Sequence, residues 1–128
     1  MSFSSILKKT EQYLLLTAEG SYSYADMLEF VDKSMAGIEK SGFRRVIVDI
    51  SKVLGNIPDE ERFNLGVYCS QFLTGPLTIA LVYRENDINH LFEHVAWNEG
   101  VRVSVVGGLE QATTLLTKGN SSAVFPGS

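Results

Sequence analysis

The sequence predicts an α/β fold: a mixed, mainly parallel sheet of about five strands, with an N-terminal antiparallel hairpin and four helices. Two β-branched runs, RVIVDI at 45–50 and LTIALVY at 77–83, are apolar almost throughout, which is typical of strands covered on both faces. Helical patterns alternate with these runs, and this alternation favours parallel strands joined by right-handed crossovers. We therefore expect the two runs to be adjacent or near-adjacent central strands.

The first third of the chain supplies the hairpin and one helix. Residues 5–9 and 12–18 have the composition of two strands joined by a polar turn, and we expect them to pair antiparallel at one edge of the sheet. Ser23 and Asp26 have the spacing of a capping box, in which side chains satisfy free N–H groups of the first helical turn. Apolar residues follow at helical spacing, and Gly42 stands where such a helix ends.

The remaining elements follow from the same signals. Pro58 fits the first position of a second helix because its missing N–H costs nothing there. Gly107 and Gly108 follow a strand without the G-x-G-x-x-G pattern of a dinucleotide site, so we interpret them as a plain turn. We expect helices at about 58–73, 88–99 and 109–118, and strands at 77–83 and 101–106.

Length and charge limit the function classes. The 128 residues fit one domain, which we place at residues 1–118, followed by a loop-like tail at 119–128. The net charge is −4 and Lys and Arg do not cluster, which argues against nucleic acid or an anionic membrane surface as a partner. No apolar run is long enough to span a bilayer.

The cysteine content indicates the compartment. Cys69 is the single cysteine, so an internal disulfide and a multi-cysteine metal site are excluded. An unpaired thiol suits a reducing environment, and the N-terminus lacks the long apolar stretch of a signal peptide, so we expect a cytoplasmic protein. Cys69 shares helical spacing with Leu65 and Phe72, which predicts a buried, unreactive thiol rather than a nucleophile.

Two stretches carry a resemblance to a known family. RVIVDISKVLGNIPDEE, residues 45–61, combines an apolar strand, a D-I-S-x-V turn and the start of a helix, and VRVSVVGGLEQATTLL, residues 101–116, combines a strand and a helix. In this order they resemble the STAS domain, the fold of sulfate transporters and anti-sigma-factor antagonists, also called SpoIIAA-like. The resemblance implies a regulatory module that binds a protein partner and is switched by phosphorylation of a serine where the second helix begins.

The chain departs from the family at that switch. Where the family has D-S-x-G, residues 57–60 or, two positions on, 59–62 offer no hydroxyl, so the implied phosphorylation has no acceptor. In this the chain is similar to divergent STAS-like domains, including the STAS/Sec14-like group. The Sec14 side of that likeness implies a small apolar or lipid-like ligand, although fold likeness alone does not establish function.

Three acids, Asp59, Glu60 and Glu61, occupy the position of the missing switch. Two interpretations stay open. A fixed negative charge at a helix start can imitate the electrostatics of a phosphate. Alternatively, the acids simply complement the positive end of the helix dipole. An effect on partner binding would distinguish the two.

The segment HLFEH, residues 90–94, matches H-x-x-E-H, an inverted zinc-protease pattern. Such chemistry needs His90 and His94 on one helix face as metal ligands and Glu93 as general base. Known proteases with this pattern are far larger and supply a long substrate cleft. We therefore interpret the match as coincidence and predict no metal and no cofactor.

Two helix faces carry apolar side chains opposite the expected core stripes. Phe63 and Val67 lie on the reverse of the second helix, and Trp97 lies on the reverse of the third, beside the histidines. Trp is enriched at contact surfaces. Either these residues form a partner site, for a homodimer or another protein, or another part of the chain covers them.

These observations predict a non-enzymatic module that works by binding a protein partner or itself, with Asp59, Glu60, Phe63, Val67 and Trp97 as candidate contacts. The alternative is a carrier of a small apolar or lipid-like ligand held between helices and sheet. An internal apolar pocket would favour the carrier, and a solid core with an apolar outer patch would favour the binding module.

Overall fold

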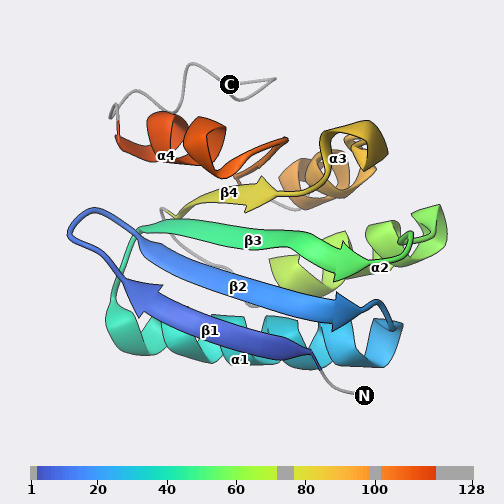
Figure 1. Cartoon of the computed structure of the whole chain (residues 1–128), viewed down its shortest axis with the longest axis horizontal. Coiled ribbons are helices and arrows are strands. Elements are labelled where there is room, and N and C mark those ends of the chain that lie inside the picture. Colours follow the sequence, from blue (N-terminus) through green and yellow to red (C-terminus); the bar gives the residue numbers. More distant parts are fainter. Residues whose placement is uncertain (1–2, 72–76, 99–101, 118–128) are drawn as a thin grey trace.

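The five strands form one mixed sheet whose spatial order, β1-β2-β3-β4-β5, follows their order in the chain (Figure 1). The computed structural model describes residues 3–71, 77–98 and 102–117. The strands are β1 (Ser4–Lys9), β2 (Leu14–Ser21), β3 (Arg45–Leu54), β4 (Thr78–Val82) and β5 (Val103–Val106). The helices are α1 (Tyr24–Ser41), α2 (Asp59–Ser70), α3 (Leu91–Asn98) and α4 (Leu109–Thr117), with a short 3₁₀ turn, η1 (Glu85–Asp87), before α3.

The pairing of the strands confirms the predicted fold. β1 and β2 form an antiparallel hairpin at one edge, and β2, β3, β4 and β5 are parallel neighbours. The two apolar runs are adjacent, with Val46 beside Ile79 and Val48 beside Leu81. β3 lies at the centre of the sheet, as its continuous apolar composition indicates.

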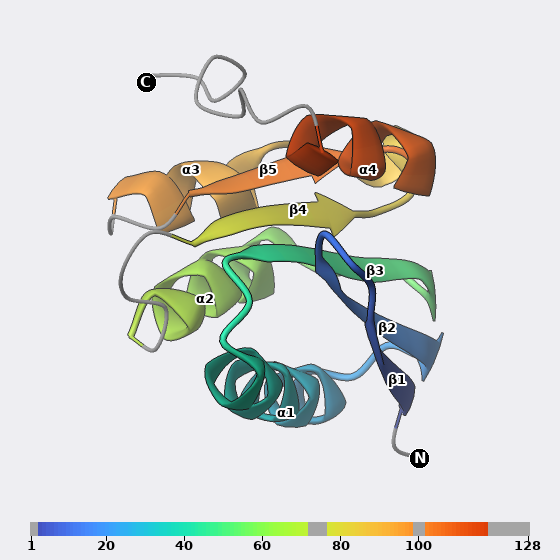
Figure 2. The same ribbon diagram turned by 90° about the vertical axis from the view of Figure 1, so that its left-hand side faces the viewer.

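Helices cover both faces of the sheet unequally. α1, α2 and α3 lie on one face and α4 lies on the other (Figure 2). Because side chains alternate along a strand, Val46 and Ile50 of β3 pack into the cluster with α1 and α2, whereas Ile47 packs with Leu116 of α4. The sheet is therefore a shared wall between a larger core and a smaller one.

The ends of α1 are as the sequence predicts. Ser23 is the N-cap, and its side-chain oxygen accepts a hydrogen bond from the Asp26 backbone N–H at 3.1 Å. Gly42 follows the helix with φ of 75° and donates its N–H to the Ile38 carbonyl oxygen. This left-handed conformation favours glycine.

The other helices differ from expectation at their ends. Pro58 is the N-cap of α2 rather than its first residue. α3 begins at Leu91, because η1 and an extended Ile88 come first. Leu109 begins α4 and is 42% exposed, whereas Ala112 and Leu116 further along the helix are buried. Predictions for residues 72–73, 99–101 and 118–128 lie outside the described residues.

The axes of α2 and α3 approach closely at Gly66. A Cβ atom at this position would lie 2.9 Å from Val95 Cγ1 and 3.2 Å from the Phe92 carbonyl oxygen. Only a residue without a side chain permits this packing. Among the residues that the structure describes, no helix is long and apolar enough to cross a membrane.

Candidate functional site

The three acids at the start of α2 have different surroundings. Asp59 accepts a hydrogen bond from Asn89 Nδ2 at 2.8 Å, and half-buried Glu61 accepts one from the Tyr22 hydroxyl at 2.6 Å. Glu60 is exposed and makes no side-chain hydrogen bond or ion pair within the described chain. Glu61 is therefore a structural contact, while Glu60 is free to meet a partner.

Two apolar residues on the outer side of α2 follow these acids in the sequence. Phe63, one turn into the helix, is 51% exposed, and Val67, one turn further, is half-buried. We call Asp59, Glu60, Phe63 and Val67 the α2 face. It combines an unpaired carboxylate with an uncovered aromatic ring.

Trp97 does not belong to that surface. The sequence left open whether Trp97 is a partner contact or is covered by another part of the chain. It is half-buried, and its indole N–H donates to the Val103 carbonyl oxygen at 2.7 Å. Trp97 lies next to the last residue of α3, so its ring reaches the strand that follows, β5. For Trp97 the structure therefore shows partial coverage by the rest of the chain, the second of the two alternatives.

The histidines of the HLFEH segment do not share a helix face. His90 precedes α3 and has a φ of 64°, and its carbonyl oxygen accepts the His94 backbone N–H. His94 is exposed within the helix, with its ring 6.5 Å from that of Trp97. The geometry that a zinc-protease motif requires is thus not formed. Among the described residues no group of three or more metal-ligating side chains occurs.

Arg62 is a buried cation that the sequence analysis missed. Arg62 is only 8% exposed, and its Nε–H donates a hydrogen bond to the Ile57 carbonyl oxygen at 2.8 Å. Its terminal nitrogens donate to the carbonyl oxygen of Asp87 at 2.8 Å and to Asn56 Oδ1 at 3.3 Å. Arg62 therefore joins the loop before α2 to the turn before α3.

Arg84 makes a second connection across the same loops. It forms an ion pair with Asp87 at 2.6 Å and donates to the carbonyl oxygens of Val53 and Gly55 at the end of β3. Both guanidinium groups lie near the Tyr83 ring, at 5.5 Å for Arg62 and 4.7 Å for Arg84. Contacts of this kind between a cation and an aromatic face are stabilising. The carboxyl ends of β3 and β4 are thus held by two arginines.

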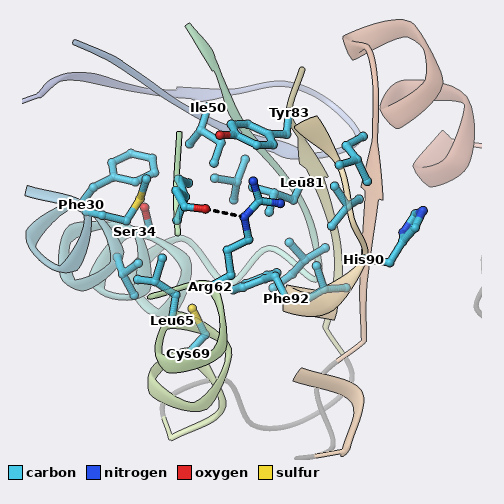
Figure 3. Close-up of a pocket in the computed structure, with 18 of the residues that line it drawn as sticks. Phe30, Ser34, Ile50, Arg62, Leu65, Cys69, Leu81, Tyr83, His90 and Phe92 are labelled. Atoms are coloured by element: carbon cyan, nitrogen blue, oxygen red, sulfur yellow. Dashed lines mark hydrogen bonds between the residues drawn. The ribbon is translucent and has the colours of Figure 1, made fainter. Parts of the chain in front are cut away.

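A cavity of about 100 Å³ lies between the sheet and the helices of its larger core (Figure 3). Its walls come from α1, α2, α3, β3, β4, β5 and the segment before α3, and most of the side chains are apolar. They include Phe30, Val31, Leu65, Ile79, Leu81 and Phe92. This is the internal apolar pocket that the carrier alternative requires.

Polar and titratable groups also line the cavity, and Arg62, Ser34 and Cys69 are among the buried ones. Ser34 on α1 is 3% exposed, and its hydroxyl has no hydrogen-bond partner in the described chain. Burial raises the pKa of the Cys69 thiol to about 12, so this cysteine is a neutral part of the wall, as predicted.

Comparisons with known proteins identify the architecture. No family model matches the sequence, and no curated protein matches it. Among solved structures, an anti-sigma factor antagonist from Mycobacterium paratuberculosis superposes with a TM-score of 0.63, at 10% identity over 90% of this chain and 94% of that one. An uncharacterised protein from Shewanella loihica with a SpoIIAA-like fold superposes with a TM-score of 0.52, at 15% identity over 90% and 93% of the two chains.

The chain has the SpoIIAA-like fold. A third neighbour is RsbS of Moorella thermoacetica in a form with one serine replaced by glutamate, with a TM-score of 0.55 and 12% identity over 89% of this chain and 95% of that one. The fold predicted from the resemblance is therefore confirmed. In this SpoIIAA-like fold the segment 57–62, which lacks a hydroxyl, forms the loop before α2 and the first turn of that helix.

Proposed function

We propose that this protein is a non-enzymatic regulatory module of the cytoplasm, which binds a protein partner through the α2 face. The observation that carries the proposal is the exposed Phe63 ring one turn away from the Glu60 carboxylate, which has no hydrogen bond or ion pair among the described residues. The names of two structural neighbours, an anti-sigma factor antagonist and RsbS, motivate a regulatory role, and the likeness itself concerns the fold.

The energetics of Phe63 favour a contact. Full burial of a side chain of this size contributes about 1.5–3 kcal/mol, and half of the Phe63 surface is still in water. Aromatic anchors surrounded by a polar rim are typical of the energetic centres of protein interfaces. Phe63 has the position of such an anchor, with Asp59 and Glu60 at its rim.

The charge of the face indicates the chemistry of the partner. Asp59 and Glu60 are both exposed, and the whole chain has a net charge of −4. A partner surface with an apolar hollow for Phe63 and Lys or Arg around it would be complementary. In this proposal the two acids supply constantly the negative charge that a phosphoserine supplies on demand.

Site-specific photo-cross-linking tests the proposal. A photoreactive amino acid replaces Phe63 in one variant and Leu109 in a control, and both variants are irradiated in the producing cells. Leu109 is a suitable control because it is also partly exposed but lies on α4, across the sheet. We expect a discrete adduct from position 63 that weakens when Asp59→Asn and Glu60→Gln are added.

The mass of the adduct identifies the partner. An adduct of twice the chain mass indicates a homodimer through the α2 face, and any other discrete mass indicates a second protein. Equal, diffuse labelling from positions 63 and 109 contradicts the proposal.

A further inference from the structure

The cavity is larger than the voids that an ordinary protein core contains. Protein interiors are packed as densely as organic crystals, with few voids larger than a water molecule. An engineered apolar cavity of about 150 Å³ stays dry and binds benzene. The cavity of about 100 Å³ between the sheet and α1, α2 and α3 approaches that size.

The cavity also contains a hydroxyl without a partner. Buried polar groups are nearly always hydrogen-bonded, and an unpaired one destabilises the fold. Ser34 lines the cavity and is only 3% exposed. Its Oγ has no hydrogen-bond partner within the described residues. Ser34 therefore leaves a polar atom of the cavity wall available to a bound molecule.

Arg62 adds a positive charge that is not paired with any carboxylate of the described residues. A buried cation usually pairs with a carboxylate. The described chain offers Arg62 no ion pair: the Asp87 carboxylate accepts from Arg84, and the Glu61 carboxylate accepts from Tyr22. The oxygens that Arg62 does contact are neutral carbonyl and amide groups.

The geometry of the guanidinium indicates the shape of the missing anion. A guanidinium carries five N–H groups, and Arg62 uses its Nε–H and one N–H on each terminal nitrogen. Among the described residues, one N–H is therefore left without an acceptor on each terminal nitrogen. This fork matches the two oxygens of a carboxylate, which arginine binds in bidentate fashion.

We propose that the cavity binds a small monocarboxylate whose apolar body is about the size of a benzene ring. The carboxylate accepts hydrogen bonds from Arg62, and the body lies against the apolar side chains of Leu65, Ile79 and Leu81. A lipid with a long chain does not fit a cavity of about 100 Å³. This site is separate from the α2 face, so either proposal can fail without the other.

Calorimetric titration of the purified protein with benzoate and with benzamide tests the site. The two molecules have nearly the same shape, and only benzoate is charged. We expect benzoate to bind at least about tenfold more tightly than benzamide, because a charge-assisted bidentate pair replaces neutral hydrogen bonds. Equal affinities, or no binding of benzoate at millimolar concentration, would overturn the proposal. This comparison uses the wild-type protein and does not depend on the folding of a variant.

Methyl NMR and two variants establish where the ligand binds. Benzoate should shift the methyl signals of Leu65, Ile79 and Leu81 and leave those of the exposed Ile6 unchanged. Ser34→Leu fills the cavity and should abolish binding. Arg45→Lys changes an exposed arginine outside the cavity and should leave the affinity unaltered. Shifts confined to surface methyl groups, or full affinity in folded Ser34→Leu, would contradict the assignment.

Discussion

Arg62 in the first turn of α2 donates a hydrogen bond of 2.8 Å to the carbonyl oxygen of Asp87 in the turn before α3. These two residues are far apart in the sequence, and the bond holds two loops together at the carboxyl end of the sheet. The same guanidinium contacts Ile57 and Asn56 on the near side. One side chain therefore fixes the position of the α2 start, where the proposed partner surface begins.

Arg62→Ala should lower the free energy of unfolding by about 2–4 kcal/mol, because it leaves buried carbonyl oxygens without donors. Urea denaturation followed by circular dichroism measures this difference. Arg45→Ala is the matched control, since Arg45 is exposed and should change stability by less than about 0.5 kcal/mol. A loss for Arg62→Ala as small as that of the control would show that the connection does not stabilise the fold.

Gly66→Ala should destabilise the protein by about 1–3 kcal/mol, although alanine is the better helix former. The added methyl group would lie 3.2 Å from a backbone oxygen, Phe92 O, which cannot rotate away as a side chain can. Thermal unfolding measures the effect, and Asn64→Ala on the exposed side of α2 is the control. A Gly66→Ala variant that melts above the wild type would mean that α2 and α3 pack less closely than described.

The raised pKa of Tyr22 implies that the free energy of unfolding depends on pH in the alkaline range. Burial, and then the hydrogen bond to Glu61, raise the pKa of Tyr22 above its ordinary value of 10.0. Above that pH the unfolded chain releases the phenolic proton while the folded chain retains it, so the stability that Tyr22 contributes is present below pH 10 and is lost as the pH rises further. Urea denaturation should show the advantage of wild type over Tyr22→Phe shrinking above pH 10. An advantage that stays constant across this range would contradict the assigned contact.

Much of the fold could be predicted from the sequence, because strand burial and helix capping are local signals. The run from Val46 to Ile50 is apolar on both of its faces, and only a central strand has two covered faces. Ser23 and Gly42 mark the ends of α1 through chemistry that acts within a few residues.

The start of α3 could not be predicted in this way. Ile88 lies one helical turn before Leu91, so apolar spacing alone extends the helix to it. The chain instead forms η1, and Asn89 accepts the Leu91 backbone N–H at 3.1 Å while His90 takes a positive φ. Hydrophobic periodicity does not detect such ends.

The polar wall of the cavity had a signal that was not used. Arg62 stands three residues before Leu65 and seven before Cys69, on the buried stripe of α2. Ser34 stands three residues after Val31 on the stripe of α1. A polar residue on an apolar stripe is informative, but whether it meets a partner or a cavity depends on distant parts of the chain.

The claim that the α2 face binds a protein is tested most directly by calorimetric titration with the purified partner that the cross-linking identifies. The comparison is between wild type, Phe63→Ser and Ile6→Ser, because Ile6 is at least as exposed as Phe63 but lies on the edge strand β1. We predict that Phe63→Ser weakens binding at least about tenfold, as expected for an aromatic anchor, while Ile6→Ser binds as tightly as wild type. A folded Phe63→Ser variant with wild-type affinity would contradict the account.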